Sequence, residues 1–321
     1  MNNKYKVLLP QQLHPAVMDS LRNEFTLIEG IDDLEEKIKY ADAAIVRTAK
    51  IDKSLINEST KLRIIIRCGV GIDNIDVDAS SEKLILVSNT PGVYTIPVAE
   101  YIIMSMIFLA KRLSIIVPSF VNGNFGIRTT MGYEVTGKTL GILGLGKIGK
   151  TVADICMKSF NMNVIAYDPY VNKEDVVFTL VDDLVDLIPK ADFLVLALPS
   201  TKETKGLIGQ KELELAKKNL IIINAARSNI IDESSLLTAL QQGTIAGAAI
   251  DVFPEEPPDF KSPIFKLSNV LLTPHIAGLT DEGFLRASTC AINELKKALE
   301  GDIPSNLANA HILQQWRKKW H

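Results

Sequence analysis

The sequence has few cysteines, no excess of charge of either sign and no long hydrophobic run. Its three cysteines, Cys68, Cys156 and Cys290, are far apart and lack the spacing of a metal site. We therefore expect reduced core thiols, no disulfide framework and no metal. With 35 basic against 38 acidic residues, the net charge is −3, which gives no reason to expect a nucleic-acid or anionic membrane partner.

Segments that would direct the chain to a membrane are also lacking. The longest apolar run, residues 102–110, is too short to span a bilayer, and residues 7–9 are too few for the hydrophobic region of a signal peptide. We expect a cytoplasmic protein whose partners are small molecules. Its 321 residues accommodate two cores of ordinary size, which predicts two domains.

Short apolar runs alternate with amphipathic segments over the first ninety residues. The expected strands are residues 7–9, 27–28, 43–46, 64–66 and 84–87. This alternation predicts a parallel sheet with helices on both faces. Pro91 and Gly92 then break the pattern, and we expect one long helix from Pro97 to about Val117. That helix is apolar nearly all round, which favours burial between domains or subunits and suggests a homodimer.

A second series of strands and helices follows. Its six expected strands are residues 140–143, 164–167, 193–198, 220–224, 246–251 and 270–273, and a helix over 280–299 returns the chain. The pattern predicts an α/β protein with two doubly wound parallel-sheet domains. We expect a flavodoxin-like substrate domain over 1–97, with 285–321 packing back on it, and a dinucleotide-binding Rossmann domain over 98–284.

A glycine-rich turn connects the first strand and helix of the second series. Gly144, Gly146 and Gly149 form G-x-G-x-x-G between the strand over 140–143 and a helix over 147–160. In that context the first glycine permits a tight bend, the second admits a pyrophosphate, and the third lets the helix pack closely on the strand. A purely structural turn is the alternative interpretation of the glycines alone.

An acidic residue ends the next strand. Asp168 lies nineteen residues after Gly149, at the carboxyl end of the strand over 163–167. A carboxylate there can accept hydrogen bonds from both ribose hydroxyls of an adenosine and repels the extra phosphate of NADP. The turn and the acid together predict NAD as the cofactor.

Three later strands end in residues suited to hydride-transfer chemistry. Arg227 follows the strand over 220–224, Glu256 the strand over 246–251, and His275 the strand over 270–273. Because the carboxyl ends of parallel strands meet at one sheet edge, we expect the three side chains near the nicotinamide. His275 would act as general acid and base, Glu256 would orient it, and Arg227 would bind a substrate carboxylate. Each residue alone also has a structural interpretation, as an ion pair, a turn or an ordinary histidine.

The order of these motifs resembles the D-isomer-specific 2-hydroxy acid dehydrogenases over nearly the whole chain. The matching stretches are residues 67–76 (RCGVGIDNID), 98–100 (VAE), 137–149, 191–199, 224–227 (NAAR), 251–257 and 273–277 (TPHIA). The resemblance implies that Arg227, Glu256 and His275 are catalytic. It implies cofactor contacts at Gly144, Gly146, Lys147, Ile148, Gly149, Asp168, Pro199, Thr204, Ala225, Ala226, Asp251 and Ala277. It also implies that Val70 and Gly71 bind the substrate carboxylate through backbone amides, beside Arg47 and with Arg227.

The identity of the substrate stays open in the sequence. Within the family, residues 46–48 and 67–76 look most like short phosphoglycerate dehydrogenases, which implies hydride transfer between NAD and C2 of a small D-2-hydroxy or 2-keto acid. Ser228 and Asn229 depart from the common pattern immediately after the catalytic arginine. The alternatives are a dehydrogenase of a phosphite or phosphonate-type substrate, since the same groups hold either oxyanion, and a non-catalytic regulator that senses NADH.

Overall fold

The computed structural model describes residues 5–320, and the chain divides into two compact units. One unit runs to Tyr94 and resumes at Leu279, and the other is Thr95–Gly278. The sequence placed these boundaries at 97/98 and 284/285. In the structure they fall at 94/95 and 278/279, at the start of α5 (Thr95–Ala110) and just before α10 (Asp281–Glu300).

The first unit is built on a five-stranded parallel sheet in the order β2-β1-β3-β4-β5, the flavodoxin-like order. Its strands are β1 (Lys6–Leu9), β2 (Thr26–Glu29), β3 (Ala43–Val46), β4 (Ile64–Arg67) and β5 (Leu86–Asn89). All four residues of β3 are buried, as expected for the central strand of a parallel sheet that is covered on both faces.

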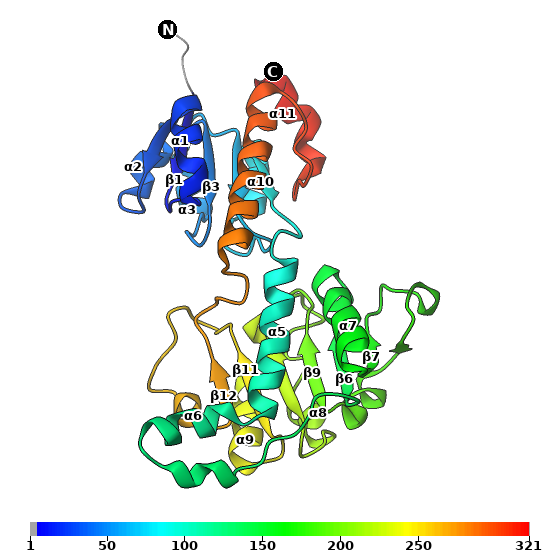
Figure 1. Cartoon of the computed structure of the whole chain (residues 1–321). Coiled ribbons are helices and arrows are strands. Elements are labelled where there is room, and N and C mark those ends of the chain that lie inside the picture. The colour runs from blue at the N-terminus through cyan, green and yellow to red at the C-terminus, as the bar shows by residue number, and fades with distance from the viewer. Residues whose placement is uncertain (1–4, 321) are drawn as a thin grey trace. The chain divides into compact units, whose positions relative to one another are not determined.

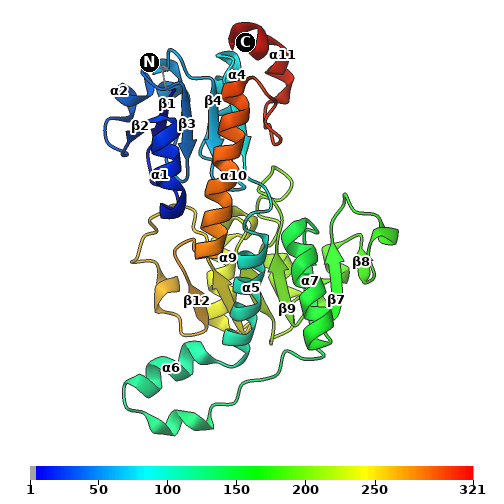
Figure 2. The ribbon, with the colours of Figure 1, turned by 45° about the horizontal axis from the view of Figure 1, so that its top comes forward.

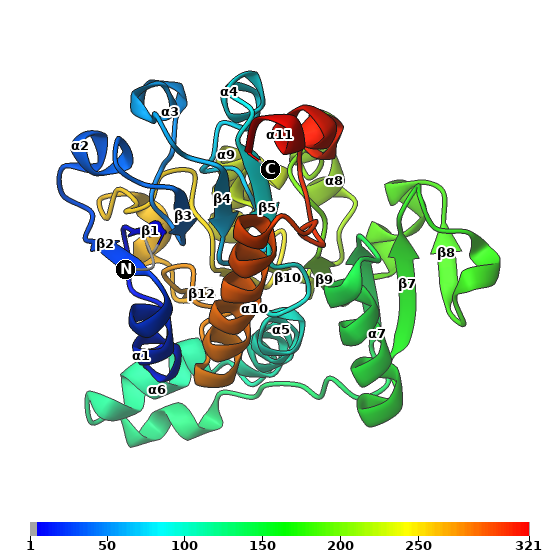
Figure 3. The ribbon, with the colours of Figure 1, turned by 90° about the horizontal axis from the view of Figure 1, so that it is seen from above.

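Helices cover both faces of this sheet (Figure 3). On one face lie α1 (Pro15–Glu24) and α10, and on the other lie α2 (Leu34–Ile38), α3 (Lys53–Glu58) and α4 (Val77–Glu82). The C-terminal helix α11 (Leu313–Trp320) packs in the same unit. Its Trp316 is fully buried and donates through Nε1 to the carbonyl oxygen of Arg63 at 2.8 Å. The tail is therefore a packing element of the first unit, as the sequence predicted.

The second unit contains a seven-stranded parallel sheet in the order β12-β11-β10-β9-β6-β7-β8. Its strands are β6 (Thr139–Leu143), β7 (Asn163–Tyr167), β8 (Thr179–Val181), β9 (Phe193–Leu196), β10 (Ile221–Asn224), β11 (Gly247–Ile250) and β12 (Val270–Leu272). The sequence predicted six strands and missed β8. This edge strand has three residues and none is buried, so it carries no hydrophobic periodicity.

The second sheet is also covered on both faces. Helices α5 and α7 (Lys147–Phe160) lie together on one face (Figures 1 and 2). On the other side of the sheet, α8 (Gln210–Glu214) and α9 (Glu233–Gln242) enclose a core of Leu and Ile side chains.

Short 3-10 turns complete the chain: η1 (Phe125–Thr129), η2 (Lys173–Asp175), η3 (Leu184–Asp186), η4 (Ile188–Lys190), η5 (Ser228–Ile230), η6 (Pro263–Lys266) and η7 (Ala310–Ile312).

The single helix expected over 97–117 is wrong, because the chain turns by 67° between α5 and α6 (Leu113–Val121). The turn is made at Arg112, which has a left-handed backbone (φ 55°) and ends α5 without the usual glycine. Helix α5 buries most of its residues, whereas α6 buries none and extends away from the sheet (Figure 1). Within residues 5–320, no single helix is long and apolar enough to cross a membrane.

Candidate active site

Three neighbouring strands bring the expected catalytic residues to one edge of the second sheet. β10, β11 and β12 are adjacent and parallel, with Asn224 paired to Ile250 and Ile250 paired to Leu272. Arg227 follows β10, Glu256 follows β11, and His275 follows β12. Their strands therefore end at the same edge, which is where ligands gather in open α/β sheets.

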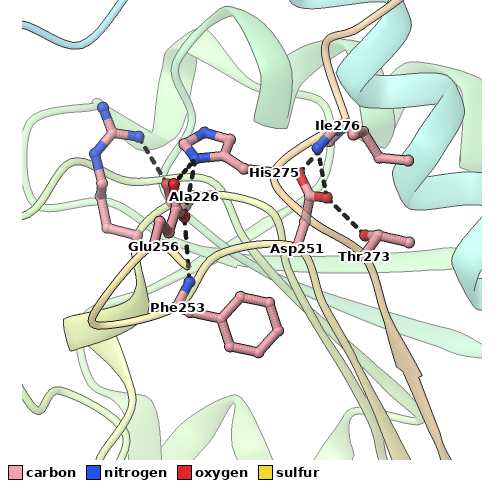
Figure 4. Close-up of polar contacts among 9 residues, drawn as sticks. Ala226, Asp251, Phe253, Glu256, Thr273, His275 and Ile276 are labelled. Carbon is pink, nitrogen blue, oxygen red and sulfur yellow. Dashed lines mark hydrogen bonds and ion pairs between the residues drawn. The ribbon is translucent and has the colours of Figure 1, made fainter. Parts of the chain in front are cut away.

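His275 and Glu256 form a direct pair (Figure 4). Nδ1 of His275 lies 3.0 Å from each carboxylate oxygen of Glu256, and Oε1 also accepts a hydrogen bond of 3.4 Å from the amide of Phe253. The two side chains remain 50% and 42% exposed. With Nδ1 directed at the carboxylate, Nε2 is the ring nitrogen left to exchange a proton with a ligand.

The backbone at His275 is strained. Its φ of 55° lies in the left-handed region, which costs a residue other than glycine about 1–3 kcal/mol. Asp251 holds this conformation, because its carbonyl oxygen accepts from the amide of His275 and its carboxylate oxygens accept from the amides of Ile276 and Ala277, all at 2.8 Å. Burial raises the pKa of the Asp251 carboxyl, although these hydrogen bonds act in the opposite direction.

Two further residues of this network were missed by the sequence analysis. Thr273 Oγ1 lies 2.6 Å from Oδ1 of Asp251, and the hydroxyl of Tyr101 on α5 lies 2.6 Å from Thr273 Oγ1. Tyr101 and Thr273 are 172 residues apart in the chain, so no local pattern could have paired them. Thr273 stands two residues before His275 in the TPHIA stretch, and its position directly after an apolar strand was the available signal.

Arg227 begins the short turn η5 on the neighbouring strand end. The turn is shaped by Asn224, whose side chain accepts from the amide of Ala226 at 3.1 Å and donates to the carbonyl oxygen of Arg227 at 2.9 Å. The guanidinium donates through Nη1 to the carbonyl oxygen of Ala226 at 2.7 Å. Asn229, which follows in η5, donates to Ser200 Oγ at 2.7 Å and so ties this turn to the loop after β9.

The glycine turn between β6 and α7 has the geometry that its spacing predicts. Gly144 has φ of 93°, and a Cβ at Gly149 would lie 2.1 Å from the carbonyl oxygen of Gly144, so both positions exclude other side chains. A Cβ at Gly146 would meet nothing within 4 Å. Gly146 is the N-cap residue of α7 and has no side chain that could accept from the first amides of the helix. Those amides therefore remain available to bind an anion, and they fit a pyrophosphate. Lys147 and Ile148 form the first turn of that helix.

Asp168 lies at the end of β7 and binds this turn directly. Its Oδ2 accepts a hydrogen bond of 2.7 Å from the amide of Leu145, and its Oδ1 accepts one of 2.9 Å from the amide of Tyr170. The carboxylate thus lies beside the glycine turn. It also fixes the backbone of the turn, a role that the sequence did not predict.

The other expected cofactor residues lie in loops at the same sheet edge. Thr204 donates through Oγ1 to the carbonyl oxygen of Pro199 at 2.7 Å and closes the loop after β9. Ala225 and Ala226 directly precede Arg227. Ala277 is buried, and its amide donates a hydrogen bond to the carboxylate of Asp251.

Within residues 5–320, no group of three or more His, Cys, Asp or Glu side chains is placed to hold a metal ion. The cysteines are free, with Cys68 and Cys156 buried and Cys290 partly exposed.

The expected substrate residues of the first unit follow the adjacent strands β3 and β4. Arg47 stacks on the ring of Phe284, with Cζ 4.3 Å from the ring centroid, and its amide donates to Gln11 Oε1 at 3.2 Å. The turn that carries Val70 and Gly71 is fixed by the last residue of β5, because the carbonyl oxygen of Val70 accepts a hydrogen bond of 2.6 Å from Asn89 Nδ2. In the part of the chain that is described, Arg47 forms no ion pair with a carboxylate.

Comparison with known proteins identifies the family. Residues 103–277 match the model of the D-isomer specific 2-hydroxyacid dehydrogenase NAD binding domain, which is more than half of the chain. The chain belongs to the D-isomer-specific 2-hydroxyacid dehydrogenases. The matched segment contains the glycine turn, Asp168 and all three residues expected to be catalytic.

Two similar relatives of this family carry different names. The chain is 40% identical to a D-3-phosphoglycerate dehydrogenase of Methanocaldococcus jannaschii, over 97% of this chain and 60% of the relative. It is 37% identical to a glyoxylate reductase of Thermococcus litoralis, over 87% of both chains. The chain therefore spans about three-fifths of the length of the phosphoglycerate dehydrogenases that it matches and most of the length of the glyoxylate reductases.

Solved structures of the family show the same two-domain architecture. A glyoxylate reductase from Paecilomyes thermophila matches with a TM-score of 0.86 and 28% identity, over 97% of this chain and 100% of that one. A second match is an NADPH-dependent glyoxylate/hydroxypyruvate reductase from Sinorhizobium meliloti, solved with NADP and malonate. It has a TM-score of 0.84 and 26% identity, over 95% of this chain and 97% of that one. These matches confirm the predicted fold class of two parallel-sheet α/β domains.

Proposed function

We propose that this chain is an NAD-dependent oxidoreductase that transfers a hydride to or from C2 of a small D-2-hydroxy or 2-keto acid. The observation that carries the proposal is the His275–Glu256 pair, with 3.0 Å between Nδ1 and each carboxylate oxygen, at the sheet edge that also holds the glycine turn. When bound there, the dinucleotide supplies or accepts the hydride.

His275 would move the proton that balances the hydride. In reduction its Nε2 donates a proton to the substrate carbonyl oxygen, and in oxidation the same nitrogen takes the hydroxyl proton. The Glu256 carboxylate orients the ring and stabilises its positive charge while the proton is held. A positioned acid or base of this kind contributes a rate factor of about 10²–10⁴.

Arg227 would bind the substrate carboxylate in fork geometry and polarise the carbonyl beside it. In the first unit, we assign anion binding to the guanidinium of Arg47 and to the amides of Val70 and Gly71. Support comes from the stacking of Arg47 on Phe284, which orients the guanidinium without a competing carboxylate among the described residues.

NAD is proposed as the cofactor in preference to NADP. The support is Asp168, whose carboxylate accepts from the Leu145 amide of the glycine turn; in this proposal it binds the ribose hydroxyls and repels a 2′-phosphate. The Sinorhizobium structure was solved with NADP, so cofactor choice differs among members of this fold. Comparing Kd values for NADH and NADPH by fluorescence tests the choice. Equal affinities would contradict it.

For the substrate, 3-phosphohydroxypyruvate is our first candidate and glyoxylate the second, following the names of the relatives. The experiment is a panel of 2-keto acids with NADH, in which absorbance at the nicotinamide band is followed, with His275→Ala as the matched control. Turnover of a 2-keto acid that is lost in the variant supports the proposal. Turnover of phosphite with NAD, or NADH binding without turnover of any substrate, would favour the two alternatives instead.

A homodimer is proposed as the state of the assembled protein. Helix α6 and the residues after it expose apolar side chains, with Phe120 56%, Val121 77%, Phe125 63% and Met131 83% exposed, whereas α5 buries most of its residues within its own unit. Such a cluster is typical of a protein interface. Sedimentation analysis should give a dimer that Phe120→Ser with Phe125→Ser converts to monomer. A wild-type monomer would refute the dimer.

A cytoplasmic location stays a prediction, supported by the free thiols.

A further inference from the structure

The loop that carries His275 is anchored by one acidic residue that has no exposed surface. Asp251 is 0% exposed. Its carbonyl oxygen accepts a hydrogen bond from the amide of His275, and its two carboxylate oxygens accept from the amides of Ile276 and Ala277. Figure 4 shows the Asp251 carboxylate directed at Thr273 and Ile276. Its hydrogen-bonding capacity is thus used within the chain, to shape the loop that carries the proposed acid.

The same residue connects the two members of the catalytic pair. Asp251 begins the loop that leads to Glu256, and its side chain holds the loop that contains His275. A rotation of the Asp251 carboxylate would therefore move His275 relative to Glu256. Besides the amides of Ile276 and Ala277, the Thr273 hydroxyl opposes such a rotation, 2.6 Å from Oδ1.

Tyr101 fixes the direction of that hydroxyl. Thr273 donates its single hydroxyl proton to Oδ1 of Asp251, so its oxygen can offer only a lone pair to Tyr101. The Tyr101 hydroxyl, 2.6 Å away, is then the donor to Thr273. The order of donation runs from Tyr101 to Thr273 to Asp251, and removing the tyrosine hydroxyl takes away one of the two groups that hold the Thr273 hydroxyl.

We propose that Tyr101, Thr273 and Asp251 form a hydrogen-bonded clamp that holds His275 in its left-handed backbone conformation, opposite Glu256. Tyr101 and Thr273 are then positioning residues for proton transfer, and neither needs to touch the substrate. The kinetic consequence rests on the proposed function, whereas the effect on the loop does not.

Hydrogen exchange of the backbone amides tests the clamp without any substrate. In Thr273→Val, the amides of Ile276 and Ala277 should exchange about 3- to 10-fold faster than in the wild type, the factor expected for one lost hydrogen bond. Tyr101→Phe should give a smaller increase in the same peptide, and Thr273→Ser should restore wild-type protection. Unchanged exchange in both Thr273→Val and Tyr101→Phe would overturn the clamp.

Kinetics with the best 2-keto acid of the panel tests the positioning role. Tyr101→Phe should lower kcat about 3- to 10-fold and raise the solvent deuterium isotope effect on kcat, because proton transfer becomes slower, while KM and the NADH Kd stay within about twofold. The matched control is Tyr133→Phe, which removes a hydroxyl that donates to Asn219 in the same unit. Equal effects of the two variants, or an unchanged isotope effect in Tyr101→Phe, would refute the role.

The two tests separate the failure of each proposal. If the wild type turns over no substrate but Thr273→Val loosens residues 275–277, the clamp stands and the proposed function fails. If Thr273→Val does not fold by circular dichroism, the decision rests on Tyr101→Phe, which removes a single oxygen from a helix side chain.

Discussion

Nδ1 of His275 lies 3.0 Å from both carboxylate oxygens of Glu256, although the two residues belong to loops after different strands. The pair predicts a graded response to substitution. His275→Gln, which cannot act as an acid, should lower kcat about 10²- to 10⁴-fold with NADH affinity unchanged. Glu256→Gln should have a smaller effect, since the ring remains but its protonated form loses stabilisation. Steady-state rates and NADH titration check both. A larger loss in Glu256→Gln than in His275→Gln would contradict the assigned roles.

The glycine turn offers a pair of variants that separates folding from cofactor binding. A Cβ at Gly149 would lie 2.1 Å from the carbonyl oxygen of Gly144, so Gly149→Ala should destabilise the protein by about 1–3 kcal/mol. At Gly146 a Cβ meets nothing within 4 Å, so Gly146→Ala should leave Tm unchanged and weaken NADH binding about tenfold or more by filling the pyrophosphate site. Thermal melts and NADH titration measure both effects. Wild-type NADH affinity in Gly146→Ala would show that the cofactor does not approach this glycine.

Asp168 should influence both cofactor choice and the shape of the turn. Asp168→Ser removes the charge that opposes a 2′-phosphate and the acceptor for the amides of Leu145 and Tyr170. We expect NADH affinity to fall about tenfold, and the ratio of NADPH to NADH affinity to rise. Tm should fall slightly, because the amides of Leu145 and Tyr170 lose their carboxylate acceptors. Asp175→Ser, an exposed acid in η2, is the control. A variant that keeps its preference for NADH would assign cofactor selection to another residue.

Asp192 should make the second unit sensitive to acid. Burial pushes the pKa of Asp192 up, but hydrogen bonds from the Thr139 amide, Asn219 and Lys217 outweigh it, and the pKa is lowered overall. A carboxyl with a lowered folded pKa contributes stability above its unfolded pKa, and this stability is lost as the pH falls through the folded value. Asp192→Asn should therefore lower the free energy of unfolding by about 1–3 kcal/mol at pH 7. The difference should shrink as the pH falls below about 4. Denaturant titrations of the wild type and the variant, at pH 7 and below about pH 4, check this prediction. The same difference in unfolding free energy at both pH values would contradict the linkage.

Local patterns predicted most of the fold and singled out the candidate site residues. The strand β7 and the helix α7 occupy the residues that the sequence predicted, because an apolar run in a buried strand and a helix bounded by glycine and asparagine are both set by neighbours in the chain. Where the pattern is weak, the prediction failed. β8 has no buried residue, and the break at Arg112 is marked by neither glycine nor proline.

The sequence by itself determined that Arg227, Glu256 and His275 follow three strands of a parallel series, since parallel pairing follows from the alternation of strands and helices. Only the tertiary structure decided how the loops after those strands are held. Asp251 accepts the amides of the His275 loop, Tyr101 reaches Thr273 across 172 residues, and Asp168 binds the glycine turn. These contacts join side chains to distant backbone, and they depend on packing that no local periodicity encodes.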